Sequence, residues 1–137
     1  MSKWFWVICL LLISICLSFC AQKNQPVIGM NSKGNAKIGM DLFGKVLVGD
    51  HMAPGCTTCH SLEIGKTLVG PSLARLGNKA QTHLEGKSAA AFLYESIIDP
   101  DAIIADGFEA GIMYRDYRND LTEQQIADLV AYLSSLK

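Results

Sequence analysis

The sequence has almost no excess of charge of either sign. Its 137 residues carry 12 Lys and Arg against 13 Asp and Glu, for a net charge of −1. A near-neutral chain lacks the basic surface that tracks nucleic-acid phosphates, so nucleic acid is excluded as a partner. The alternation of apolar and polar residues that marks β-strands is also almost absent, which excludes sheet-based folds. Cysteine is sparse too, since only Cys56 and Cys59 of the five cysteines lie beyond residue 20.

A long apolar stretch opens the chain. Residues 4–19 are uncharged and almost wholly apolar, and Lys3 precedes them, which is the layout of a secretion signal. Residues 17–20, Leu-Ser-Phe-Cys, resemble the bacterial lipoprotein signal, in which the cysteine, here Cys20, receives the lipid. The run is at the short edge of the roughly 17–25 residues that span a bilayer. We therefore expect residues 1–20 to be a signal peptide, a lipoprotein signal or a membrane anchor.

The leader predicts an exported protein. We expect it in the periplasm or on the extracytoplasmic face of a bacterial membrane, held there by lipid on Cys20 or by the N-terminal helix. Cleavage of the leader would instead release it. Residues 21–36 are polar, contain Gly and Pro and have no periodicity, so we expect a flexible linker. Residues 37–137 have the length of one domain.

Three stretches of this domain have the apolar spacing of helices. The first is expected over residues 36–48, with Leu42 and Val46 on its apolar face. Gly39 and Gly44 each cost such a helix up to ~1 kcal/mol relative to Ala. A glycine on the apolar face is explained if a second helix crosses close to the backbone there.

The other two helices have clear ends. Residues 88–99 begin at Ser88, a good N-cap residue, and stop before Pro100. The last helix begins at Thr122, which forms a capping box with Gln125. Three or four short helices with long loops bury too little surface by themselves. The sequence therefore predicts an all-α domain wrapped round a group that is not protein.

The Cys-Thr-Thr-Cys-His run that contains Cys56, Cys59 and His60 indicates what that group is. Two thiols at this spacing meet the two vinyl groups of a haem, and the next residue is an imidazole that reaches the iron. A structural zinc site would add His51 or His83 as its fourth ligand. A thioredoxin-like dithiol would need a βαβ setting, which the helical pattern does not offer. Together with the export signal and the poor core, the motif favours haem.

Residues 37–137 resemble class I cytochromes c. The resemblance is carried by residues 56–60, by Val-Gly-Pro-Ser-Leu at 69–73 and by residues 121–133. Residues 94–100, followed by Gly107 and Phe108, are similar to the cytochrome domain attached to the copper-bearing subunit II of some haem–copper oxidases. The resemblance implies the cytochrome c fold and one covalently attached haem c. It also implies that the Pro71 carbonyl accepts a hydrogen bond from the ring of His60, the first iron ligand.

The resemblance places the second iron ligand at Met113, in the irregular segment before the last helix. Tyr114 follows it where the family usually has proline. The rival ligand is His83, which would give bis-histidine iron, whereas His51 lies too near the attachment motif. Several side chains are candidates for contact with the haem propionates, none of them singled out: Arg75, Asn78, Lys79, Tyr94 and Arg115.

These features predict one-electron transfer by a protein that is not itself an enzyme. We expect it in a membrane-associated respiratory or photosynthetic electron-transport chain, as a tethered carrier or as a subunit of a larger complex. The partners expected are redox proteins such as a terminal oxidase, a quinol-oxidising complex or another cytochrome. The alternative is a peroxidase-like or ligand-binding haem protein in which the sixth ligand, Met113, is labile.

Overall fold

The computed structural model of the chain describes residues 33–82 and 86–137. The expected signal, lipidation site or anchor at residues 1–20 and nearly all of the expected linker lie outside these ranges, as does His83. Within the described ranges, none of the helices has the length and hydropathy needed to cross a membrane.

The described residues form five α-helices, one 3-10 turn and one pair of very short strands. The longer helices are α2 (Ala36–Phe43), α4 (Ala89–Ile98) and α6 (Glu123–Ser135). The single-turn elements are η1 (Cys56–Thr58), α3 (Leu76–Lys79) and α5 (Tyr117–Asp120). Strands β1 (Leu47–Val48) and β2 (Ala53–Pro54) pair antiparallel. The predicted all-α class with short helices and long loops is confirmed, although the two single-turn helices raise the number above three or four.

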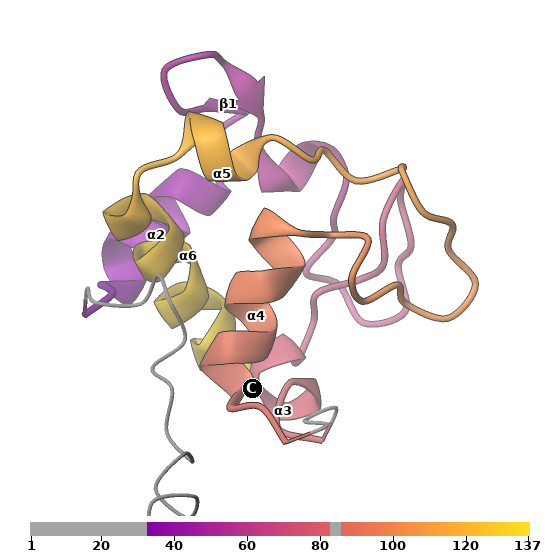
Figure 1. Cartoon of the computed structure of the whole chain (residues 1–137). Coiled ribbons are helices and arrows are strands. Elements are labelled where there is room, and N and C mark those ends of the chain that lie inside the picture. The colour runs from indigo at the N-terminus through magenta and orange to yellow at the C-terminus, as the bar shows by residue number, and fades with distance from the viewer. Residues whose placement is uncertain (1–32, 83–85) are drawn as a thin grey trace, which may run out of the picture.

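Helices α2 and α6 cross at backbone contact, as Gly39 predicted (Figure 1). A Cβ atom added at Gly39 would lie 1.9 Å from the carbonyl oxygen of Asp128 in α6. The buried carboxylate of Asp128 accepts hydrogen bonds from the Asn35 N–H at 2.7 Å and from Gln124 Nε2 at 2.9 Å. The start of α2 is thereby tied to the first turns of α6.

Helix α2 is shorter than predicted, because it ends at Phe43 rather than continuing through residue 48. Gly44 caps it, and the chain then turns back into β1. The Gly55 N–H donates to the Val46 carbonyl at 2.7 Å, while the Val46 side chain is 69% exposed. The prediction that Val46 belongs to an apolar helical face is therefore wrong, since the strand pair buries Val48 in its place.

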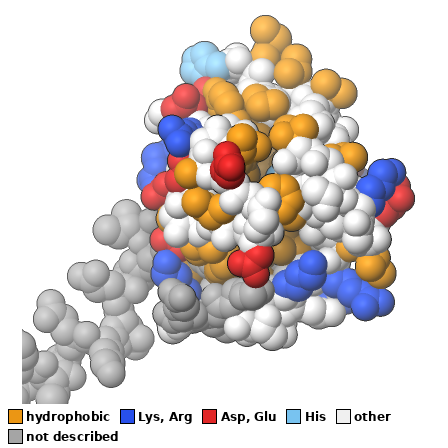
Figure 2. Space-filling model, turned by 90° about the vertical axis from the view of Figure 1, so that its right-hand side faces the viewer, with side chains coloured by type: hydrophobic (Ala, Val, Ile, Leu, Met, Phe, Trp, Pro, Cys, Tyr) orange, Lys and Arg blue, Asp and Glu red, His pale blue; other side chains and the backbone are white. Residues whose placement is uncertain are grey.

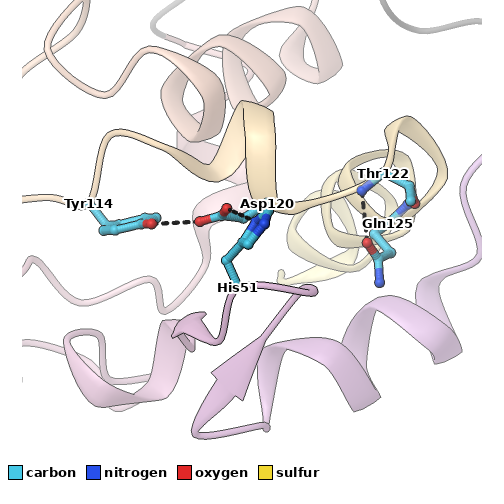
Figure 3. Close-up of polar contacts among 5 residues, drawn as sticks. All are labelled: His51, Tyr114, Asp120, Thr122 and Gln125. Atoms are coloured by element: carbon cyan, nitrogen blue, oxygen red, sulfur yellow. Dashed lines mark hydrogen bonds and ion pairs between the residues drawn. The ribbon is translucent and has the colours of Figure 1, made fainter.

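The predicted caps of α4 and α6 are confirmed. Ser88 Oγ accepts from the Ala91 N–H at 3.2 Å, and α4 ends at Ile98, two residues before Pro100. Thr122 and Gln125 exchange two hydrogen bonds, N–H to Oε1 at 2.8 Å and N–H to Oγ1 at 3.2 Å. Figure 3 shows the first of these. Helices α2, α3 and α4 all pack on α6.

On the far side of α4 from α2 and α6, two long loops cover the molecule (Figure 1). One runs from the end of η1 to α3, and the other from the end of α4 to α5. Neither contains a helix or a strand of its own. The conformation of these loops therefore does not depend on the hydrogen bonds of regular secondary structure.

Candidate functional site

A cavity of about 1000 Å³ lies between α4 and the two long loops. Its walls are mostly apolar and include Phe92, Leu93 and Ile97 of α4, with Leu129 and Leu133 of α6 behind them. Figure 2 views the loop side of the molecule, where hydrophobic side chains are spread over the face and most charged ones of both signs lie toward its edges. The cavity provides the space for the non-protein group that the small apolar core predicted.

The thiols of Cys56 and Cys59 and the ring of His60 all line this cavity. The 3-10 turn brings them together, because the Cys59 and His60 N–H groups both donate to the Cys56 carbonyl, at 3.2 and 2.9 Å. The Thr58 hydroxyl donates to the Gly55 carbonyl at 2.6 Å and closes the turn. Both cysteines are free thiols. Burial raises the pKa of Cys56 to about 11, so this thiol is protonated at neutral pH.

The imidazole of His60 is oriented by its neighbours. Its Nδ1 lies 2.9 Å from the carbonyl oxygen of Pro71, which is the contact that the resemblance implied. A carbonyl only accepts, so Nδ1 carries the proton and Nε2 keeps a lone pair for a metal. A Cβ atom added at Gly70 would lie 2.5 Å from Cε1 of the ring. The chain at residues 70–71 therefore holds the ring on one side and leaves Nε2 as its ligand atom.

Met113 reaches the same cavity from the loop between α4 and α5. It is half-buried and packs against the hydrophobic core. The structure thus brings together all five residues predicted for the site: Cys56, Cys59, His60, Pro71 and Met113.

Of the two other histidines considered as ligands, His51 does not line this cavity. His51 lies on the turn between β1 and β2, where its Nδ1 is 2.7 Å from Asp120 Oδ1 (Figure 3). His83 falls outside the described residues. Among the described residues, no cluster of three or more His, Cys, Asp or Glu side chains is arranged to hold a metal ion. The zinc site with His51 as its fourth ligand therefore gains no support from the described residues.

Of the five propionate candidates, Lys79 and Arg115 line the cavity. Arg115 is paired with Asp101 at 2.5 Å. Tyr94 is engaged elsewhere, since its hydroxyl donates to the Glu123 carboxylate at 3.1 and 3.2 Å. The sequence alone did not show which of the five candidates line the cavity, because the charge of a side chain does not indicate whether its loop directs it inward.

Three residues beside the site escaped the sequence reasoning. The Tyr117 hydroxyl donates to the Pro54 carbonyl at 2.6 Å, and burial raises the pKa of this tyrosine. Asp101 and Asp120 accept hydrogen bonds from residues on either side of Met113 in the loop between α4 and α5, here called the Met113 loop. Their partners are distant along the chain or irregularly spaced, so no periodic pattern marks them.

These observations fit an iron porphyrin. The apolar cavity suits its faces, the two free thiols suit covalent attachment, and an oriented imidazole and a thioether suit its iron. A family model described as "Cytochrome c" matches residues 44–137. Comparison with curated proteins finds no match.

Proposed function

The chain belongs to the cytochrome c family, and from that membership we propose that Cys56 and Cys59 attach the haem and that His60 and Met113 bind its iron. The family binds haem c covalently and transfers electrons through it, and the helices and long loops of this chain fit its fold. When bound, the haem supplies a one-electron couple at its iron. The observation that carries the assignment of ligands is that Cys56, Cys59 and His60 from one segment and Met113 from a distant loop line one cavity.

The residues around the site tune the iron. The Pro71 carbonyl fixes the His60 ring and makes Nε2 a better donor. The thioether of Met113 favours the reduced iron and so raises the potential relative to a second imidazole. The apolar walls lower the local dielectric and exclude water from the faces of the group. Each of these effects acts on an electron carrier and none requires a substrate.

With His60 and Met113 both bound, the iron has no open position for oxygen or peroxide, which favours electron transfer. The peroxidase-like alternative requires Met113 to leave. Ready binding of cyanide or carbon monoxide by the resting protein would support that alternative, and resistance to both would oppose it.

The cellular context is proposed from the sequence. The leader with Cys20 and the likeness of residues 94–100 to an oxidase-attached cytochrome support a place in a membrane-associated respiratory or photosynthetic chain. The terminal oxidase, quinol-oxidising complex or second cytochrome expected as partner would dock briefly, since redox encounters use small interfaces. Apolar side chains exposed on the loop between η1 and α3, outside the cavity lining, suit such a contact: Leu62, Ile64 and Leu68.

The ligand assignment is tested by Met113→Ala in protein produced with its haem. We expect the covalent haem to remain, the reduction potential to fall and cyanide to bind readily, because the variant would lose one proposed iron ligand and keep His60 and both attachment cysteines. Met52→Ala is the matched control, since Met52 is 68% exposed on the β1–β2 turn. Equal effects of the two substitutions, or none, would refute Met113 as the ligand.

The cellular setting is tested by solubilising native membranes in mild detergent and following haem absorbance through a sizing column. Elution with a much larger assembly would support a subunit of a complex. Elution at the size of one chain in a micelle would support a tethered carrier. Recovery in the wash before detergent would contradict membrane attachment.

A further inference from the structure

The segment that carries Met113 has no regular structure between α4 and α5, so its position depends on side-chain contacts. Tyr114, the next residue, provides one of them. Its hydroxyl donates to Asp120 Oδ2 at 2.5 Å (Figure 3). Tyr114 is thereby attached to the last residue of α5, which leads directly into α6.

Asp120 is well placed to act as an anchor. Its side chain is only 6% exposed, and its other oxygen, Oδ1, lies 2.7 Å from His51 Nδ1. The hydrogen bond from Tyr114, followed by that from His51, lowers the pKa of Asp120 against the opposing effect of burial. An ionised carboxylate only accepts, so Tyr114 and His51 are both donors. The anchor therefore has a partner on each oxygen.

The Tyr114 ring is held from a second direction. It meets the ring of Tyr117 edge-on, with the centroids 5.0 Å apart and the planes at 72°. The Tyr117 hydroxyl in turn donates to the Pro54 carbonyl, two residues before Cys56. The Met113 loop is thus connected to the segment that carries the attachment motif as well as to α5.

We propose that Tyr114 and Asp120 are positioning residues that hold the Met113 thioether at the cavity. The hydrogen bond between them restrains the residue next to Met113, as a proline at position 114 would restrain it through its fixed φ. This inference rests on the proposed function, because it takes Met113 as an iron ligand. His51, whose side chain is 73% exposed, contributes less, since water competes for its hydrogen bond.

The test is the affinity of the ferric haem-loaded protein for added imidazole, which competes with methionine for the iron. Tyr114→Phe removes one hydroxyl, and Asp120→Asn removes the charge while keeping the side-chain shape. We expect each to raise the imidazole affinity about tenfold, the size that the loss of one hydrogen bond to a charged acceptor produces. The charge-transfer band given by sulfur bound to ferric haem should weaken in parallel. Asp116→Asn, the same change at an exposed position of the same segment, should leave both unchanged.

Met113→Ala is measured alongside as the reference. If it leaves imidazole affinity unchanged, Met113 is not a ligand, and the ligand assignment fails together with this inference. If it raises the affinity while Tyr114→Phe and Asp120→Asn do not, the assignment stands and the positioning role is overturned. A fall in thermal stability of the two variants without a change in imidazole affinity would also overturn it, because the contact would then serve the fold alone.

Discussion

The two sides of α4 are built in different ways. On one side, α2 and α6 meet backbone to backbone, with Gly39 against the Asp128 carbonyl and a buried carboxylate joining their ends. On the other side, two loops without regular structure face a cavity of about 1000 Å³. The first side is completed by the polypeptide itself. The second side is completed by the haem that the family binds. The two loops on that side are otherwise held by a few polar contacts.

This difference predicts where each kind of change acts. Substitutions at the helix crossing alter the stability of the whole domain and leave the iron ligands in place. Substitutions at the loop contacts alter the ligation of the iron more than the stability. A bound haem would connect the two sides, because the cavity is lined by Leu129 and Leu133 of α6 as well as by the two loops.

The largest effect is expected from removing the haem with Cys56→Ala and Cys59→Ala together. Without the haem, the apolar walls of this cavity would lose the group that covers them, and a typical domain has only ~5–15 kcal/mol of stability in total. We therefore expect loss of cooperative unfolding and of amide protection in both long loops, measured by hydrogen exchange. Thr57→Ala, an exposed change inside the same motif, is the control and should keep the haem. Loops that stay protected without haem would contradict the contrast between the two sides.

The next effect in size is expected from Gly39→Ala. Its new Cβ would lie 1.9 Å from the Asp128 carbonyl oxygen. Neither helix can relieve this clash without moving its backbone. We expect the free energy of unfolding to fall by about 3 kcal/mol, at the upper end for overpacking, while the haem spectrum stays unchanged. Denaturant unfolding measures the first quantity.

Gly44→Ala provides the matched control on the same helix. An added Cβ there meets no atom closer than 3.6 Å, and the backbone is in the right-handed helical region. We expect no destabilisation, or a gain of up to ~1 kcal/mol, because alanine restricts the unfolded chain. Equal losses at the two glycines would mean that helix propensity, and not the crossing, sets the cost.

Gly39 is also an example of a feature of the fold that could be predicted from the sequence. Capping residues and Pro100 predicted both ends of α4 and the start of α6, and Gly39 predicted a close crossing, because each signal lies within one turn of chain. The end of α2 was missed, since the return of the chain through β1 depends on pairing with β2. His51 and Asp120 are separated by 69 residues, so their contact leaves no local pattern. The attachment motif was readable because the spacing of its two thiols is itself the chemical requirement.

A smaller effect, on the loop side, is expected from the titration of Asp120. Its pKa in the folded protein is lowered, first by the hydrogen bond from Tyr114, so the ionised form favours folding. The resulting stability is present above the ordinary aspartate pKa of about 4 and is lost as the pH falls through the lower folded value. Asp120→Asn should therefore be less stable than the unchanged protein at neutral pH and approach it below about pH 4. Denaturant midpoints across pH measure this, and an advantage that persists in acid would exclude the carboxylate as its source.

The smallest effect is expected from Asp101→Asn, which separates the exposed contact of the Met113 loop from the buried one. Asp101 accepts from the Gly111 N–H at 2.7 Å and from the Arg115 guanidinium at 2.5 Å, but the Arg115 side chain is 61% exposed. Water and salt screen such a pair, so we expect a loss of at most ~1 kcal/mol in the free energy of unfolding, shrinking further at high salt. Imidazole affinity should rise less than in Tyr114→Phe, with Asp116→Asn on the same loop as the exposed control outside the cavity lining. A larger rise than in Tyr114→Phe would mean that the loop is held chiefly from its α4 end, and the buried Asp120 would then be secondary in positioning Met113.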